Sequence, residues 1–209
     1  MKLLIAVPCT DYMHAQTVRS LIGLTRRLQG DGLDFEVAVC DGTPAHVARE
    51  KLACKAINEG YDQVLWIDAD MVFGPDVLED LQFCDKDFVT GLCYARRPPH
   101  MCCAFTDARA DHLARVEDPP TEPMEIDGCG FAMVLIKTDI LRAIKMHYKT
   151  CFCPEPEYGE DLTFCRRAKT LGYKIWLDPC VQPGHIGHTV IYRAEAEEYR
   201  RRLEETRNA

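Results

Sequence analysis

Hydrophobic and polar positions along the chain form blocks whose lengths and periods predict an α/β fold. Short, wholly apolar runs at residues 3–7 and 64–67 are typical of parallel strands that are buried on both faces. Between these runs, apolar residues recur at helical spacing, as at Val18, Leu21 and Ile22. Strands and helices alternate over the first part of the chain. This order predicts a mostly parallel, Rossmann-like sheet that is flanked by helices and joined by right-handed crossovers.

The same pattern predicts where the elements lie. Strands are expected at residues 3–7, 35–40, 64–67, 88–94, 131–137 and 174–177. Helices are expected at residues 15–28, 44–60, 75–83, 160–171 and 193–203, with one more that contains Leu141 and Ile144. Thr10 or Asp11 is expected to cap the first helix and Thr138 the fourth, with Pro44 at the first position of the second. Residues 95–123 are expected to form a long surface excursion with room for one hairpin.

Length and composition narrow the class of protein. The chain has 209 residues, of which 47% are hydrophobic and 28% are charged, as in a soluble globular domain with a sizeable core. We therefore expect one domain over residues 1–192, with a charged helix at residues 193–209 that packs on it or extends from it. The formal net charge of −8 provides no general attraction to nucleic acids or anionic membranes.

Hydropathy and cysteine usage both favour a cytoplasmic protein. No apolar run approaches the roughly 20 residues that a membrane span needs, and the apolar start of the chain is interpreted as a strand and not as a signal peptide. No stable membrane insertion is expected, and the oligomeric state stays open. The twelve cysteines include no Cys-x-x-Cys pair, so we expect reduced thiols. A zinc module built from Cys151, Cys153 and Cys165 remains an alternative.

The chemistry most clearly indicated by the sequence lies just after the strand at residues 64–67. Asp68 and Asp70 follow this strand at a spacing of two residues. Ligands of open α/β sheets bind outside the carboxyl ends of such strands. Two carboxylates there are unfavourable unless hydrogen bonds or a cation compensate them, and Mg²⁺ or Mn²⁺ shared with substrate phosphates would do so. The alternative is that one of the two aspartates only caps the next helix.

A nucleotide pocket is expected beside these carboxylates. Thr10 and Asp11 follow the first strand and Asp41 follows the second, where they could bond to a base or a ribose. No G-x-G-x-x-G sequence follows the first strand, which argues against NAD or FAD, and no Walker A sequence is present. Arg96 and Arg97 open the long excursion and are candidates to clamp phosphate or acceptor, or else are solvated.

Four motifs together resemble those of GT-A fold glycosyltransferases. They are Asp68-Ala69-Asp70, Gly128-Cys129-Gly130, Gly159-Glu160-Asp161 and Gly184-His185, and they occur in the order found in that family. In detail the chain is similar to the small family-2-like enzymes of bacteria and bacteriophages, over residues 3–188. The resemblance implies a single GT-A (Rossmann-like) domain with a mostly parallel central sheet.

The resemblance also implies roles for the donor side of the site. Asp70 would be the direct metal ligand, and Asp68 would also reach the ribose. His185 would complete the metal site, with His188 as the weaker candidate, and an imidazole favours Mn²⁺ over Mg²⁺. Arg49 would face the aspartates or the donor phosphates.

Other roles implied by the resemblance concern the acceptor side. Asp161 would act as the general base and Glu160 would hold the acceptor, although acidic residues in a first helical turn are also ordinary partners of the helix dipole. The glycines of Gly128-Cys129-Gly130 would allow close approach of the donor sugar or acceptor, near Arg96. The Cys between them leaves the contact chemistry open.

The function that we infer from the sequence is a metal-dependent glycosyltransferase. It would move a hexose-type sugar from a nucleotide donor, with UDP-sugars expected first, to a hydroxyl acceptor, and inversion is slightly favoured. The alternatives are a nucleotidyltransferase that releases pyrophosphate and a non-catalytic nucleotide-sugar-binding protein. Acceptor-binding loops vary most within a fold, so polysaccharide, lipopolysaccharide, protein and a hydroxymethylated base in phage DNA all stay open.

Overall fold

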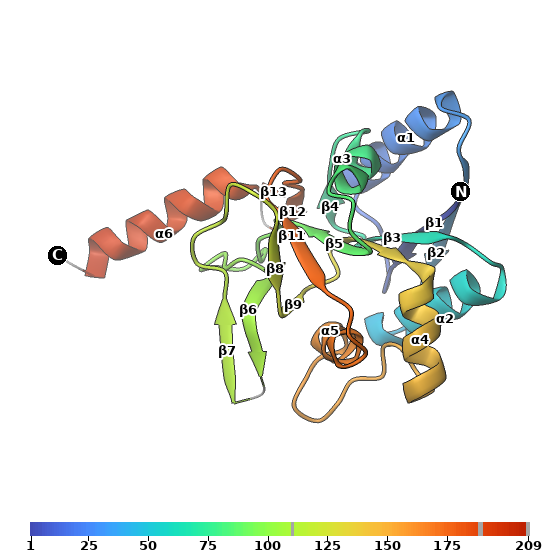
Figure 1. Ribbon diagram of the computed structural model, residues 1–209. Coiled ribbons are helices and arrows are strands. Elements are labelled where there is room, and N and C mark those ends of the chain that lie inside the picture. Colours follow the sequence, from blue (N-terminus) through green and yellow to red (C-terminus); the bar gives the residue numbers. More distant parts are fainter. Residues whose placement is uncertain (110, 188–189, 208–209) are drawn as a thin grey trace.

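A seven-stranded sheet forms the centre of the computed structural model, which describes residues 1–109, 111–187 and 190–207. Its strands lie in the order β2-β1-β3-β10-β5-β11-β8 (Figure 1). They are β1 (Lys2–Pro8), β2 (Asp34–Cys40), β3 (Gln63–Ile67), β5 (Phe88–Gly91), β8 (Met124–Ile126), β10 (Met133–Lys137) and β11 (Ile175–Asp178).

Most strands of this sheet point the same way. β1 is parallel to β2 and β3, and β11 is parallel to β5. β10 lies antiparallel between β3 and β5, so β5 runs in the direction of β3, and β8 is antiparallel to β11. The predicted mostly parallel α/β sheet is therefore confirmed. The carboxyl ends of β1, β2 and β3 meet at one edge, which is where ligands of such sheets bind.

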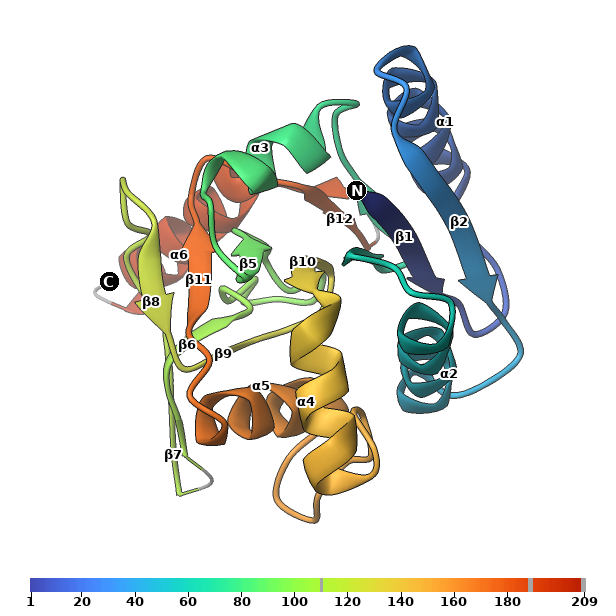
Figure 2. The same ribbon diagram turned by 45° about the vertical axis from the view of Figure 1, so that its right-hand side comes forward.

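Helices cover both faces of the sheet (Figure 2). α1 (Ala15–Gly30) and α3 (Val77–Phe83) pack on one face, and α2 (Ala45–Asn58), α4 (Thr138–Tyr148) and α5 (Glu160–Thr170) pack on the other. The two faces of β3 illustrate the arrangement, because Trp66 belongs to one core and Leu65 to the other. This double burial explains why the strand is wholly apolar in sequence.

Two small three-stranded sheets complete the fold, and only part of them was predicted. The expected hairpin in the long excursion is confirmed as β6 (Ala104–Arg109) and β7 (His112–Arg115), to which β9 (Gly128–Cys129) adds a strand. The second small sheet was not predicted. It joins β4 (Met71–Val72), β12 (Gly184–Ile186) and β13 (Val190–Ile191). It brings the end of the chain next to the segment after β3.

Several predicted element boundaries and caps were wrong. α1 begins after His14, whose N–H donates to Ala69 O at 3.1 Å, so neither Thr10 nor Asp11 caps the helix. Pro44 precedes α2 instead of opening it, and Thr138 is the first residue of α4 rather than its cap. In these cases tertiary contacts set the helix start, and none of the three helices has a side-chain cap.

Strand and helix lengths also differ from the expected ones by a few residues. β5 ends at Gly91 instead of residue 94, because the Leu92 N–H donates to Val181 O at 2.7 Å and leaves the ladder. β10 begins at Met133 instead of residue 131, and α3 begins at Val77 instead of residue 75. Shifts of one or two residues at the ends of elements are ordinary, because helix and strand ends fray.

The charged C-terminal helix α6 (Arg193–Arg207) is longer than expected and projects from the domain (Figure 1). Its first half packs through the fully buried Ala196 and through Tyr199, whose ring meets that of His100 edge-on at 5.1 Å. Residues 208 and 209 of the predicted C-terminal segment lie outside the described residues. Within the described part of the chain, no helix has the length and apolarity required to cross a membrane.

Five aromatic rings form the centre of the core beneath the carboxyl edge of the sheet. They are Trp66, Phe88, Phe131, Phe152 and Phe164, all at most 1% exposed. Phe152 and Phe164 stack at 4.7 Å between ring centroids, and the other neighbours meet edge to face. Rings packed in these geometries add to the stability that comes from their buried area.

We expect Phe164→Ala to lower the free energy of unfolding by about 3–5 kcal/mol, because it opens a cavity in this aromatic core. Phe83→Ala is the matched control, since Phe83 is 92% exposed and its truncation leaves no cavity. The measurement is urea unfolding of both variants and the wild type. Equal losses in the two variants would contradict this account of the core.

Candidate active site

A cavity of about 450 Å³ opens at the carboxyl edge of the sheet. Its walls come from the loops after β1 and β3, from α2, from the segment after β5 and from the first turn of α5. The lining residues are Pro8, Cys9, Thr10, Asp11, Tyr12, His14, Ala45, Arg49, Asp68, Ala69, Asp70, Arg96, Glu160 and Asp161. The fold thus gathers around one cavity most of the residues that were singled out in the sequence.

Arg49 on α2 is buried beside this cavity and bonds to three carboxylates. Nη1 donates to Glu160 Oε1 at 2.7 Å and to Asp161 Oδ1 at 2.6 Å, and Nη2 donates to Asp68 Oδ1 at 2.9 Å. Only 4% of the Arg49 side chain is exposed. A buried charge of either sign is unfavourable alone, so the guanidinium and the carboxylates compensate one another. One side chain thereby joins the end of β3 to the start of α5.

Asp161 has the properties of a proton acceptor. Burial raises the pKa of Asp161 to about 6, helped by the charges of Glu160 and Asp68 and opposed by Arg49. Its Oδ2 accepts the Phe131 N–H at 3.3 Å, and 28% of the side chain remains exposed. A carboxylate with this pKa is mostly charged at neutral pH and still binds a proton well, which suits a general base.

Asp70 faces a second set of cations. His185 Nε2 lies 3.3 Å from its Oδ2, and Arg96 Nη1 lies 2.5 Å from the same oxygen. Burial alone would raise the pKa of Asp70, but the hydrogen bond and charge of His185, together with Arg96, hold this pKa below its usual value. Burial would likewise lower the pKa of His185, but Asp70 outweighs it and raises that pKa.

The orientation of His185 suits a metal ligand. Its Nδ1 lies 2.9 Å from Tyr94 O, and because a carbonyl only accepts hydrogen bonds, Nδ1 carries the proton. Nε2 faces Asp70, which favours a proton on that nitrogen when no metal ion is bound. A metal ion would replace this proton, and the backbone carbonyl would keep the imidazole in orientation. An imidazole nitrogen beside a carboxylate oxygen is a donor set that transition ions such as Mn²⁺ accept.

Asp70 and His185 therefore fit a metal ion, whereas Asp68 is placed differently. Asp68 points Oδ1 toward Arg49, and burial raises its pKa against the charge of that arginine. Across residues 1–109, 111–187 and 190–207, no three His, Cys, Asp or Glu side chains already converge as a metal cluster. Asp68 as a further ligand stays a prediction, and His188 lies outside the described residues.

The loops after β1 and β2 run side by side at the rim of the site. The Gly42 N–H donates to Thr10 O at 2.9 Å, and the Cys9 N–H donates to Cys40 O at 2.9 Å. Thr10, Asp11 and Asp41 are exposed, but Asp41 does not line the cavity. Contacts of these residues with a nucleotide stay a prediction.

Gly128, Cys129 and Gly130 were expected beside the donor sugar or acceptor, and the structure places them mainly behind α5. A Cβ on Gly128 would lie 2.8 Å from Leu162 Cδ2, and the Cys129 N–H donates to Cys165 Sγ at 3.5 Å. These two residues do not line the cavity. A Cβ on Gly130 would lie 3.8 Å from the Asp161 Oδ2. Direct contact of this loop with a substrate therefore stays a prediction.

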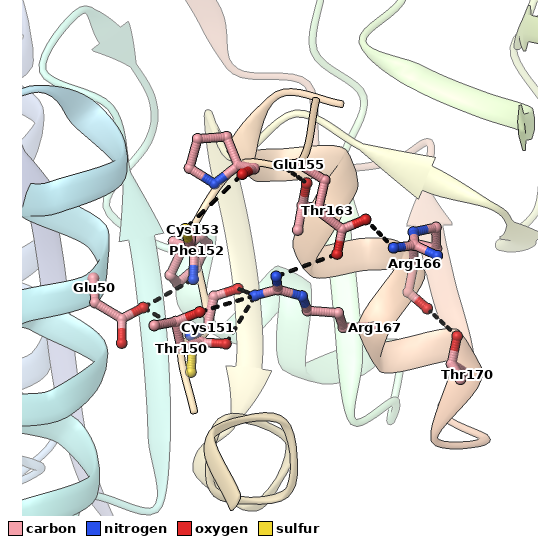
Figure 3. A network of polar contacts seen from close by, with 11 residues as sticks. Glu50, Thr150, Cys151, Phe152, Cys153, Glu155, Thr163, Arg166, Arg167 and Thr170 are labelled. Atoms are coloured by element: carbon pink, nitrogen blue, oxygen red, sulfur yellow. Dashed lines mark hydrogen bonds and ion pairs between the residues drawn. The ribbon is translucent and has the colours of Figure 1, made fainter. Parts of the chain in front are cut away.

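Hydrogen bonds from α2 and from α5 hold the start of the segment at residues 150–159, before α5 (Figure 3). Glu50 Oε2, from α2, accepts two backbone N–H groups, that of Cys151 at 2.7 Å and that of the next residue at 2.9 Å. The buried Arg167, from α5, donates to Thr150 O at 2.8 Å. Because Glu50 follows Arg49 in sequence, consecutive residues of α2 hold this segment and the first turn of α5.

The rim of the cavity contains two aromatic residues that were not predicted from the sequence. Tyr12 is 71% exposed, and its ring meets that of His14 edge-on at 5.5 Å. An exposed aromatic ring offers a stacking surface for a planar base. The signal that could have identified Tyr12 is its place in a polar loop directly after the first strand.

Comparison with known proteins supports the fold. The crystal structure of A197 from STIV matches with a TM-score of 0.57 and 18% identity, over 90% of this chain and 86% of that chain. No protein-family model and no curated protein matches the chain. At this identity the likeness concerns the fold alone.

Two other solved structures match more loosely. One is a protein from Bacillus anthracis described as a glucose-1-phosphate thymidylyltransferase in complex with sucrose, with a TM-score of 0.40 and 17% identity over 82% of this chain and 69% of that chain. The other is a glycosyltransferase involved in the glycosylation of the major capsid of PBCV-1, with a TM-score of 0.38 and 11% identity over 71% of this chain and 66% of that chain.

We expect Arg49→Met to lower the free energy of unfolding at pH 7 by about 3–5 kcal/mol, because three carboxylates lose their buried counter-charge. Their pKa values would then rise, so the deficit should narrow as the pH falls toward about 5. Arg27→Met is the matched control, because Arg27 also pairs with three carboxylates, Asp31, Asp76 and Glu79, but is exposed. Urea unfolding at both pH values measures the difference. A deficit in Arg49→Met that does not depend on pH would contradict the assigned network.

Proposed function

We propose that this chain is a metal-dependent glycosyltransferase that moves a hexose-type sugar from a nucleotide donor to a hydroxyl acceptor. The observation that supports the proposal most directly is the arrangement of charges around one cavity. Asp161, the base candidate, bonds to Arg49, which also bonds to Asp68, and Asp70 lies two residues further along the chain and faces His185, its proposed partner in metal binding. This arrangement lies at the sheet edge where α/β folds bind ligands.

The donor side uses the loop after β1 and the segment after β3. Asp70 and His185 would hold Mn²⁺ or Mg²⁺, which neutralises the charge that develops on a diphosphate leaving group. Thr10, Asp11 and the exposed ring of Tyr12 offer polar and stacking contacts for a ribose and a base. We propose a UDP-sugar as the first donor to test.

The acceptor side uses the first turn of α5. Asp161 takes the proton of the acceptor hydroxyl while the hydroxyl oxygen attacks the anomeric carbon and the bond to the nucleoside diphosphate breaks. Arg49 and the Phe131 N–H fix the Asp161 carboxylate, and Glu160 lies beside it for contact with the acceptor. A single base on the acceptor side corresponds to inversion of configuration.

A glycan hydroxyl is the acceptor that we would test first. A DNA acceptor would require a shared basic face, and the candidate residues for such a face are Arg96, Arg97, Arg109, Arg115, Arg166 and Arg167. In the structure Arg109 pairs with Asp107, and Arg166 pairs with Glu155. Three further candidates also donate to groups of the chain itself: Arg96 to Asp70, Arg115 to the Cys102 carbonyl and Arg167 to the Thr150 carbonyl. These internal bonds reduce the charge available to phosphates.

We expect Mn²⁺ to be required for a nucleotide to raise the melting temperature, because a ligand that binds only the folded state stabilises it. The measurement is a thermal-shift screen of UDP, GDP, CMP and TDP, each with and without Mn²⁺. Asp70→Asn should abolish the Mn²⁺-dependent shift, since it removes a charged ligand. Asp139→Asn is the control, because Asp139 is exposed on α4. A shift that persists in Asp70→Asn would overturn the metal assignment.

We expect the rate of UDP release from a UDP-sugar that the protein binds, with water as the acceptor, to rise as the pH increases through about 6. The reason is that the general base must be deprotonated, and burial raises the pKa of Asp161 to about 6. Asp161→Asn should remove this rising limb and lower the rate by about 10²–10⁴-fold, while UDP affinity stays near that of the wild type. Glu157→Gln, in the exposed part of the preceding segment, is the control. An unchanged pH profile in Asp161→Asn would place the base elsewhere.

A further inference from the structure

Arg96 and His185 approach the same oxygen of Asp70. The distances to Oδ2 are 2.5 Å from Arg96 Nη1 and 3.3 Å from His185 Nε2. A metal ion that is shared by Asp70 and His185 would bind this oxygen directly, at about 2.0–2.2 Å. Like charges that share one carboxylate repel each other, so the Arg96 guanidinium lowers the affinity of Asp70 for such an ion. Arg96 therefore competes with a metal ion for the negative charge of Asp70.

The backbone of Arg96 is held firmly, whereas its side chain is accessible. A Cβ on Gly187 would lie 2.8 Å from Arg96 O, so this glycine allows the two backbones to approach closely. The Ala95 N–H donates to Met101 O at 2.9 Å, and Tyr94 O bonds to His185 on the other side. By contrast, 48% of the Arg96 side chain is exposed, compared with 16% for Asp70. The guanidinium can therefore move while its attachment point stays in place.

A displaced Arg96 would still face the cavity. Arg96 lines it together with Thr10 and Asp11 from the loop after β1. The planar guanidinium presents five N–H donors and binds phosphate oxygens in a bidentate manner. A diphosphate that enters the cavity thus offers Arg96 a partner with more negative charge than Asp70.

We propose that Arg96 is a cation gate that couples metal binding to nucleotide-diphosphate binding, an inference that rests on the function proposed above. Without a nucleotide, Arg96 neutralises Asp70 and competes with the metal ion. With a nucleotide diphosphate, Arg96 leaves Asp70 for the phosphate oxygens and the competition ends. The metal ion therefore binds weakly alone and tightly with the nucleotide. By thermodynamic linkage, the metal ion raises the affinity for the nucleotide by the same factor by which the nucleotide raises the affinity for the metal ion.

The test measures Mn²⁺ binding to the full chain by electron paramagnetic resonance of free Mn²⁺, with and without UDP, so that no turnover is needed. We expect Arg96→Gln to bind Mn²⁺ roughly three- to tenfold more tightly than the wild type without UDP, because a partly exposed competing ion pair is lost. With saturating Mn²⁺, the same variant should bind UDP roughly tenfold more weakly, because the phosphate contact is lost. The factor by which UDP improves Mn²⁺ affinity should shrink accordingly.

Two further variants separate charge from structure. Arg96→Lys keeps a competing cation and should bind Mn²⁺ as weakly as the wild type without UDP. Arg97→Gln removes a neighbouring exposed arginine that does not line the cavity and should leave both affinities unchanged.

The outcomes are distinguishable. If the wild type binds Mn²⁺ with UDP but Arg96→Gln shows no gain in Mn²⁺ affinity without UDP, the gate is overturned and the proposed function stands. If the wild type binds no Mn²⁺ with UDP, nor with GDP or TDP, both the gate and the metal-dependent function are overturned. An equal gain in Arg97→Gln would show a general charge effect and would also overturn the gate.

Discussion

The candidate site depends on the buried guanidinium of Arg49. Asp68 comes from the end of β3, whereas Glu160 and Asp161 come from the start of α5, more than ninety residues later in the chain. When the fold brings these three carboxylates together in a cavity, they repel one another. A single planar cation with several donors holds them within hydrogen-bond distance, which an ammonium of a lysine would do less well. The position of Asp161, the proposed base, relative to the sheet edge therefore follows from one side chain of α2.

The rest of the fold is arranged so that this contact can form. The doubly covered sheet fixes where β3 ends, and the aromatic cluster around Phe131 and Phe164 fixes where α5 begins. The small sheet of β4, β12 and β13 brings His185 to Asp70 from the far end of the chain. Long-range packing of this kind explains why residues from five separate segments share one cavity.

The sequence predicted the sheet and most of the residues around the cavity, and physical reasons explain what it did not predict. Apolar runs report burial, so six of the seven strands of the central sheet were predicted. The strand β8 was not predicted, because it has only three residues and pairs at the edge of the sheet with β11 alone. The two-residue strands β4 and β13 are too short to show a period, and their existence depends on pairing with β12. The caps at Thr10 and Thr138 failed for a similar reason, because distant contacts set the helix starts.

The direction of each side chain was beyond reach of the residue pattern, although the family resemblance implied that Arg49 would face the aspartates or the donor phosphates and that His185 would join Asp70. An acidic residue after a strand is a candidate metal ligand whichever way it points, and only the structure shows that Asp68 turns to Arg49 while Asp70 turns to His185. The same holds for Gly128 and Cys129, whose small size serves contact with α5. The order of the motifs predicted which residues lie near the cavity, and packing determined where each side chain points.

Glu50 and Arg167 hold the segment before α5 at its start, and this affects which of its residues can be substituted. Glu50 and Arg167 bind its first residues, whereas Pro154, Pro156 and Glu157 near its tip are exposed. Changes at the tip would alter the exposed surface that precedes Glu160 and Asp161 without disturbing the bonds of Glu50 and Arg167. Under the proposed function, the segment would separate a constant site from a variable surface, and an exchange of a few residues at its tip would change the acceptor.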